Sequence, residues 1–314
     1  MKPRQTFGAV VVAVLLLFTA ACSDDGPTVS APSSPAATPT SPAPTASPTT
    51  APGPVASAST SEPTTPSSSS TSAGPTPPSQ PYKVGQCLGP KPGYTQMSCS
   101  QPHTYEVFSV RNDSRDAGDL VKRAAWKSAT CNQDAAGFFG SQSFVLSRLD
   151  AIPLPDAAIS KPDAEIVCVA YEFRESLSGL VTNTGSLKNK LKGDGFYRYN
   201  VCAKGRPSTS DDVEVVSCKE PHAAEATGAK LNGKPGDKFP GSDKIQAAAV
   251  KFCLPLGQKF LGAKRPDVIA SQNSGGSGPW SRGLMVTGCF VEVTKGTVKK
   301  SLRGIGNKPL DSYR

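Results

Sequence analysis

The nine cysteines of this 314-residue chain fall into one isolated residue and two sets of four. The sets are Cys87, Cys99, Cys131 and Cys168, then Cys202, Cys218, Cys253 and Cys289. Successive gaps are 12, 32 and 37 residues in the first set and 16, 35 and 36 in the second. Because the two sets agree in both number and order of spacing, the pattern predicts one structural unit repeated in tandem.

A motif at the second cysteine of each set supports the duplication. Residues 99–106 and 218–225 share the pattern Cys-x-x-Pro-His-x-x-Glu, which contains the only two histidines of the chain. After the third cysteine, both sets continue with six residues, a phenylalanine, an apolar residue and a glycine. We therefore expect repeat one at residues 82–174 and repeat two at 196–293, with a connector at 175–195 and a basic C-terminal tail at 294–314.

Hydrophobic patterning predicts an α+β fold in which each repeat is a small disulfide-bonded unit. Strands are expected around the first cysteine (82–88 and 197–202), at 106–110 and 213–216, and around the fourth cysteine (165–171 and 284–293). An amphipathic helix should precede the last strand.

The helix of each repeat is expected to carry an apolar stripe. In repeat one, Asp116 is expected to cap a helix whose shared face is formed by Leu120, Ala124, Lys127 and Cys131. In repeat two the helix begins at Ser242 or Asp243 and aligns Ile245, Ala249, Phe252 and Leu256. Pro255 is expected to kink or restart this second helix.

Disulfides are expected because each repeat is small and poor in aromatic residues, so its core is modest. Each bond then contributes about 2–4 kcal/mol. Four cysteines allow three pairings per repeat, and we favour Cys87–Cys99, Cys131–Cys168, Cys202–Cys218 and Cys253–Cys289. The alternative, a metal site of four thiolates, lacks a Cys-x-x-Cys element and suits a reducing compartment better.

The N-terminus is typical of an exported protein. Basic Lys2 and Arg4 precede an apolar run at 7–18 and small residues at 19–21, which predicts a signal peptide at 1–21. Cys22 resembles the lipid-accepting cysteine of a bacterial lipoprotein, although cleavage after Ala21 by an ordinary signal peptidase is an alternative. Lipidation would account for the odd cysteine and anchor the chain at the outer face of the cell membrane.

Residues 22–81 are predicted to form a disordered stalk after the lipidated cysteine. Fifteen of the 30 prolines fall between Ser23 and Pro81, among Ser, Thr, Ala and Gly. Such a composition cannot bury enough apolar area to offset the cost of ordering the backbone. The stalk is expected to act as a spacer, or as an unselective linker.

The repeated motifs resemble a known family. Val84-Gly85-Gln86-Cys87, the Pro-His-x-x-Glu motif, the helix ending in Phe138-Phe139-Gly140 and the final cysteine strand are similar to the septum-formation domain of high-GC Gram-positive (actinobacterial) bacteria. Trp280, ahead of Cys289, is a further similarity. Repeat two departs at Tyr199-Asn200-Val201, and repeat one has no Trp before Cys168. The resemblance implies a location in the cell envelope and a role near cell division, and it implies no established reaction.

The Pro-His-x-x-Glu motif is the candidate ligand site. If the repeats face each other, His103, Glu106, His222 and Glu225 could bind a metal. In an extended strand, however, residues three apart lie on opposite faces. The alternative is structural: the glutamate accepts local backbone N–H bonds and the histidine packs beside it. We favour the structural role, with no metal and no cofactor.

Positive charge bears on the choice of partner. The chain has a formal net charge of +9, and Lys188, Lys190 and Lys192 of the connector are basic, as are tail residues Lys295, Lys299, Lys300, Arg303 and Lys308. An exported protein is not expected to have nucleic acid as its partner. Anionic wall polymers, lipid headgroups or division-site proteins fit better, and simple solubility is the alternative.

Together these features predict a non-enzymatic, lipid-anchored envelope protein that presents two binding modules, linked to septum formation or wall organisation. The rival functions are a wall-active hydrolase with His103 or His222 as base and a metal-binding envelope protein. No catalytic residue is assigned.

Overall fold

The structure is a computed structural model, and it describes residues 81–210 and 213–314. These residues fall within a single compact unit. The predicted signal peptide, Cys22 and nearly all of the predicted stalk lie outside the described residues.

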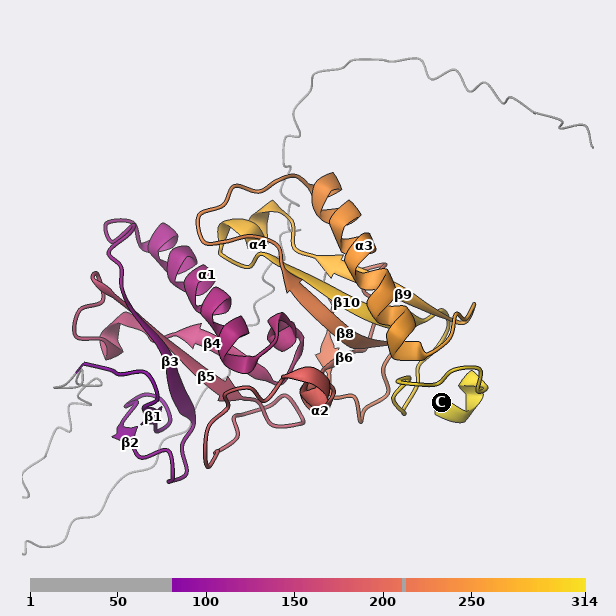
Figure 1. The fold of residues 1–314 in the computed structure, drawn as a ribbon, viewed down its shortest axis with the longest axis horizontal. Coiled ribbons are helices and arrows are strands. Elements are labelled where there is room, and N and C mark those ends of the chain that lie inside the picture. Colours follow the sequence, from indigo (N-terminus) through magenta and orange to yellow (C-terminus); the bar gives the residue numbers. More distant parts are fainter. Residues whose placement is uncertain (1–80, 211–212) are drawn as a thin grey trace, which may run out of the picture. The chain divides into compact units, whose positions relative to one another are not determined.

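Repeat one forms a five-stranded antiparallel sheet with one long helix (Figure 1). Its elements are β1 (Cys87–Leu88), β2 (Gln96–Met97), β3 (Tyr105–Asn112), α1 (Leu120–Phe139), η1 (Gln142–Leu146), β4 (Leu149–Pro153), η2 (Asp156–Ala158) and β5 (Glu165–Glu172). The strand order is β2-β1-β3-β5-β4, which places β4 at an edge. Helix α1 packs on one face of this sheet, around Cys131, Ala135 and Phe139.

Repeat two has the same arrangement. Its elements are η3 (Gly193–Gly195), α2 (Phe196–Tyr199), β6 (Cys202–Ala203), β7 (Val215–Val216), β8 (Ala224–Leu231), α3 (Ser242–Leu261), β9 (Val268–Ser274), α4 (Ser277–Ser281), β10 (Val286–Val293) and η4 (Leu310–Tyr313). The strand order β7-β6-β8-β10-β9 matches that of the first sheet position by position. The predicted α+β class and the two disulfide-bonded repeats are therefore confirmed.

Four disulfides tie these elements together. They are Cys87–Cys99, Cys131–Cys168, Cys202–Cys218 and Cys253–Cys289, the same four pairs that the sequence favours. In each repeat the first bond fixes the short strand at the sheet edge, and the second joins the helix to the core strand. Each repeat is thus cross-linked twice.

The start of α1 differs from the expectation. The cap is Asp119, whose carboxylate accepts hydrogen bonds from the backbone N–H groups of Val121 and Lys122. The expected apolar stripe is also wrong at its beginning, because Leu120 is 79% exposed and Ala124 is exposed as well. The buried side of the first turns is instead polar: Arg123 donates to the backbone carbonyls of residues 115, 162 and 165.

Helix α3 agrees better with its prediction. It begins at Ser242 and continues through Pro255 to Leu261 without a restart. Ile245 and Ala249 are buried on the sheet side, as expected, and the ring of Pro255 lies on the exposed side.

Strands were the weakest part of the prediction. Strand β8 was not expected, because Ala, Gly and Lys dominate its sequence, and pairing with β6 and β10 overrides that low propensity. Edge strands β4 and β9 were also not expected. Residues 196–199, expected in part as strand, form helix α2.

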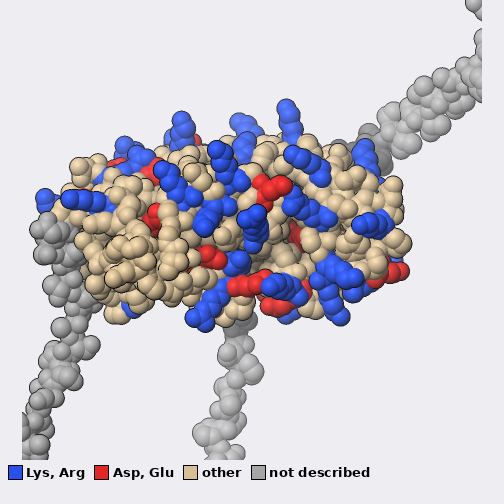
Figure 2. Space-filling view, turned by 60° about the horizontal axis from the view of Figure 1, so that its bottom comes forward, with Lys and Arg blue, Asp and Glu red and all other residues tan. Residues whose placement is uncertain are grey.

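Lysine and arginine are abundant on the surface, and one face on which they gather is seen in Figure 2. The basic residues named above in the connector and the tail are all exposed. Among residues 81–210 and 213–314, no helix has the length and apolar character that a membrane span requires.

Candidate structural site at the Pro-His-x-x-Glu motifs

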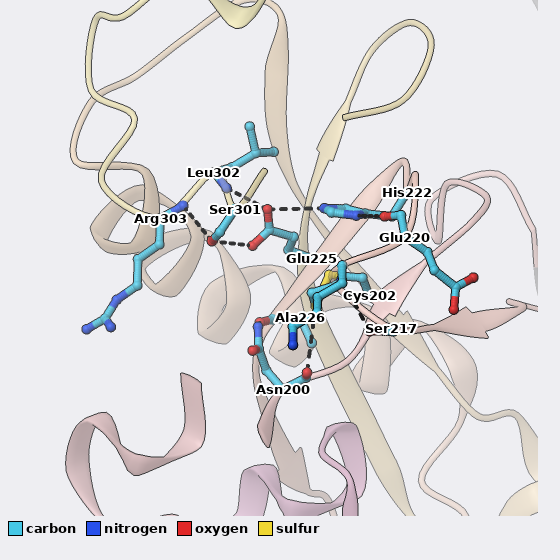
Figure 3. Close-up of a disulfide and its surroundings, with 12 residues drawn as sticks. Asn200, Cys202, Ser217, Glu220, His222, Glu225, Ala226, Ser301, Leu302 and Arg303 are labelled. Carbon is cyan, nitrogen blue, oxygen red and sulfur yellow. Dashed lines mark hydrogen bonds and ion pairs between the residues drawn. A yellow bond between two sulfur atoms is a disulfide. The ribbon is translucent and has the colours of Figure 1, made fainter. Parts of the chain in front are cut away.

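In repeat two, the motif glutamate is the centre of a buried hydrogen-bond network (Figure 3). Glu225 lies in β8, opposite Cys202 of β6, and neither it nor His222 is exposed. Its Oε1 accepts from the backbone N–H of Leu302 at 2.5 Å, and its Oε2 accepts from the Ser301 hydroxyl at 2.8 Å. The Nε2 atom of His222 lies 3.3 Å from the same Oε1. Both carboxylate oxygens are therefore occupied by partners from the chain itself.

Repeat one reproduces this network at Glu106. Its Oε1 accepts from the Ser186 hydroxyl and its Oε2 from the backbone N–H of Leu187, both at 2.7 Å. Glu106 lies opposite Cys87, as Glu225 lies opposite Cys202. The difference is the histidine: Nε2 of His103 is buried without a hydrogen-bond partner among the described residues.

The backbone of each motif histidine is bonded to the same stretch of chain that supplies the partners of the motif glutamate. His103 exchanges two backbone hydrogen bonds with Asn183, at 2.9 and 2.8 Å, and His222 does the same with Val298. In both repeats the ring Nδ1 also contacts the carbonyl two residues earlier, that of Gln101 or Glu220. We call residues 183–192 and 298–310, which the motifs hold in this way, the first and second anchored segments.

Apolar side chains complete the attachment of the anchored segments. Leu187 and Leu191 are buried in the core of repeat one, beside Phe139. Leu302, Ile305 and Leu310 are buried in repeat two, beside Phe260. Part of the predicted connector and part of the predicted tail therefore pack against the repeat that precedes them.

The pairing of His222 with Glu225 affects its protonation. Burial disfavours the charged imidazolium, but the hydrogen bonds to Glu225 and to the Glu220 carbonyl outweigh it, so the pKa of His222 is raised above 6.5. A proton on His222 is thus stabilised by the folded structure.

The expectation that histidine and glutamate lie on opposite faces is wrong in repeat two. His222 precedes β8 and makes only an isolated bridge, so it does not follow the alternation of a regular strand. The glutamate does accept backbone N–H bonds, but these come from residues 77 and 81 positions away rather than from local ones.

The structure brings together one set of potential metal ligands among the described residues: Cys202, His222 and Glu225, with ligand atoms within 4.8 Å of one another. Cys202 is bonded to Cys218 and so offers no thiolate. The glutamate oxygens are already committed to Ser301 and Leu302. Among the described residues, no four-ligand set forms from His103, Glu106, His222 and Glu225.

With this geometry in place, comparison with known families gives one match: residues 151–289 match the family model described as septum formation. The chain carries a septum-formation domain. The predicted family match is thereby confirmed for residues 151–289, and its description suggests a cell-division-related envelope role; the septum-formation family is not a known enzyme family. No curated protein and no solved structure matches the chain at a significant level.

The septum-formation match runs from β4 of repeat one to β10 of repeat two. It spans parts of both repeats rather than covering each separately, so two copies of the domain stay a prediction. That prediction rests on the repeated cysteine pattern and the repeated strand order. The actinobacterial lipoprotein character also stays a prediction.

The anchored segments contain a repeated element that the sequence interpretation missed. Ser186-Leu187-Lys188 and Ser301-Leu302-Arg303 occupy equivalent places, each with the serine hydroxyl and leucine N–H on the motif glutamate. The serine oxygen also accepts from the N–H of the following basic residue. A search for Ser-Leu-basic at matching distance from each glutamate would have found it.

Proposed function

We propose that this chain is a non-enzymatic envelope protein that presents two basic modules to anionic wall polymers at sites of cell division. One observation carries the proposal: in each repeat a buried glutamate fixes a segment that carries several exposed basic side chains. Leu187 and Leu302 point into the core, whereas Lys188, Lys190 and Lys192, and Lys299, Lys300 and Lys308, are exposed.

Burial of the motif supports a binding role over catalysis. His103 and His222 are only 2% and 0% exposed, so neither ring can reach a polymeric wall substrate as a general base. Glu106 and Glu225 already use both oxygens within the chain. The motif therefore serves the basic surface indirectly, by holding its backbone in place.

Attachment to the membrane is the second part of the proposal. Signal cleavage would leave Cys22 at the new N-terminus, where a diacylglycerol would anchor the chain on the extracytoplasmic face. The four disulfides support export, since such bonds persist in oxidising compartments. The stalk would then separate the basic modules from the lipid.

The polymer-binding proposal is tested with the full chain and two charge-reversal variants. In the first, Lys188, Lys190 and Lys192 are changed to Glu; in the matched control, the exposed residues Lys83, Lys91 and Lys161 are changed to Glu. Binding to purified wall fractions is measured by co-sedimentation at low and high salt. We expect the first variant to bind at least about tenfold more weakly and the control to lose less, because only the first removes the anchored charges. Equal losses, or no wild-type binding at low salt, would reject the proposal.

The anchor is tested separately by replacing Cys22 with Ser. We expect the wild-type chain in the membrane fraction, labelled by a fatty-acid probe, and the variant unlabelled and released. Unchanged labelling and fractionation would show that Cys22 is not the acceptor.

A further inference from the structure

A groove runs along the free edge of the second sheet. It encloses about 380 Å³ and is lined on one side by Gln246, Val250 and Leu254 of α3. Its other side is formed by Pro207 and Ser208, and its floor is the edge strand β9. Figure 1 shows β9 at the edge of this sheet, beside α3. We call this cavity the β9 groove.

The backbone of β9 is open toward the β9 groove. Asp267 accepts from Thr294 N–H and Gly275 donates to Val286, so odd-numbered residues here bond toward β10. The even-numbered residues, Val268, Ala270, Gln272 and Ser274, therefore direct their N–H and C=O groups outward. Within residues 81–210 and 213–314, these outward groups have no backbone partner.

The equivalent edge of repeat one is closed. Even-numbered residues of β4 bond toward β5, so the outward donors belong to residues 149, 151 and 153. Leu149 N–H is taken by the Ser147 hydroxyl, and Ala151 N–H by the Asp150 carboxylate. Pro153 has no N–H at all. Since proteins block exposed edges in just these ways, the contrast marks β9 as an edge left available.

The side chains of the β9 groove point to a ligand of particular chemistry. Val250, Leu254 and Ile269 are 49%, 46% and 39% exposed, which is unusual for aliphatic side chains lining one cavity. The Ser271 hydroxyl, in a residue that is 9% exposed, has no hydrogen-bond partner among the described residues. No lining residue is charged. The groove therefore combines apolar contacts, an unsatisfied buried hydroxyl and an unpaired strand edge, without charge.

The shape of the groove favours a single strand over a second copy of this chain. A second β9 would bring its own α3 and its own residues 207–208 on the two faces of the sheet. The second α3 and the second residues 207–208 would then have to fit beside those of the first chain at the same narrow sheet edge. A bare peptide carries no such bulk and can enter between α3 and residues 207–208.

We propose that the β9 groove binds an extended, uncharged segment of a partner protein, which adds as a strand to β9. Its backbone would pair with the outward groups of Ala270 and Gln272, as in other strand-addition complexes. Aliphatic side chains at alternate positions would contact Val250 and Leu254 of α3. The side chains between them would lie on the opposite face, beside Ile269 and Ser271, where a hydroxyl would supply a partner for Ser271. This interaction goes beyond polymer binding and does not depend on the basic residues.

The test uses the full chain and the synthetic peptide acetyl-Ser-Val-Thr-Ile-Thr-Val-Ser-amide. Amide hydrogen exchange is measured with and without peptide, and affinity by titration. We expect slower exchange at Ala270 and Gln272. A peptide N-methylated at alternate residues, which cannot complete the ladder, should bind at least about tenfold more weakly.

Repeat one supplies a matched pair of variants. Pro153 pairs with Cys168 as Gln272 pairs with Cys289, so Gln272→Pro gives β9 the blocked edge of β4. Because the N–H of Gln272 faces outward, this change removes no bond to β10. We expect Gln272→Pro to weaken peptide binding at least about tenfold and Pro153→Gln to leave it unchanged. Leu254→Lys places a charge on the groove wall and should also weaken peptide binding. This variant still tests the groove if Gln272→Pro folds poorly.

Three results would overturn the proposal. One is exchange at Ala270 and Gln272 that the peptide does not change. Another is binding that survives both Gln272→Pro and Leu254→Lys. The third is a concentration-dependent dimer that protects β9 without peptide, which would assign the edge to a second copy of the chain.

Discussion

The backbone N–H of Leu302 donates to Glu225 across 77 residues of sequence, and Leu187 donates to Glu106 across 81. Each bond is buried and joins a glutamate of the sheet to a segment beyond the last strand of its repeat. A buried carboxylate that accepts such bonds is costly to remove, because its partners then lose their hydrogen bonds without regaining water. The Pro-His-x-x-Glu motif is thus explained as a structural anchor.

Replacing Glu225 with Ala should lower the free energy of unfolding by about 3–5 kcal/mol, since it breaks a buried pair and leaves the buried His222 ring and the Leu302 N–H unsatisfied. Glu106→Ala, which frees two donors, should cost about 2–3 kcal/mol. Urea denaturation measures both. Glu214→Ala, at an exposed position, is the control and should change little. A loss at Glu225 no larger than at Glu214 would contradict the anchor.

Stability should depend on pH through His222. Its pKa in the folded protein is raised above the 6.5 of the unfolded chain, so the folded state holds this proton more tightly. The resulting stabilisation is complete below pH 6.5 and is lost as the pH rises through the folded pKa. The advantage of wild type over His222→Asn, measured by urea denaturation, should therefore shrink as the pH rises from 6.5 through the folded pKa. An advantage that grows over this range would show that the sign is wrong.

The arrangement of the repeats could be predicted from the sequence because cysteine spacing and the paired motifs are local and countable. It failed at β8, where residues such as Ala226, Gly228 and Ala229 have little strand preference and take that conformation only through pairing with β10. It also failed at the start of α1, because Arg123 is buried by three backbone carbonyls that the pattern cannot reveal.

At the candidate site, the motif residues were found but their partners were not. Glu106 and Glu225 are visible as repeated residues. Ser186 and Ser301 lie about 80 positions later, in stretches that composition marks as connector and tail. Contacts over such separations depend on how the sheet and the chain end meet, which local patterns do not encode.

Loss of a disulfide should cost more when the closed loop is longer. Cys131–Cys168 spans 37 residues and Cys87–Cys99 spans 12. The loop-entropy relation gives about 3.8 and 2.8 kcal/mol, respectively, for replacing each pair with Ser. Thermal unfolding of the two double variants measures the order. A larger loss for the shorter loop would mean that packing rather than loop closure dominates.

Gly257 should tolerate no larger side chain. It lies on the face of α3 that contacts β9, and a Cβ atom there would come within 2.5 Å of Ala270 Cβ and 3.3 Å of Val291 Cγ1. Gly257→Val should therefore destabilise the fold by about 1–3 kcal/mol through overpacking. Gly278→Val, where a Cβ meets only the flexible end of the Arg282 side chain, is the control. Equal stability of the two variants would contradict the close approach of α3 to β9.

Hydrogen exchange of the full chain, read by mass spectrometry for the two anchored segments, tests the central claim most directly. Glu106→Ala should speed exchange in residues 183–192 and leave 298–310 protected, whereas Glu225→Ala should do the reverse. Protection that persists in both segments in both variants, or that is already absent in the wild-type chain, would contradict the account.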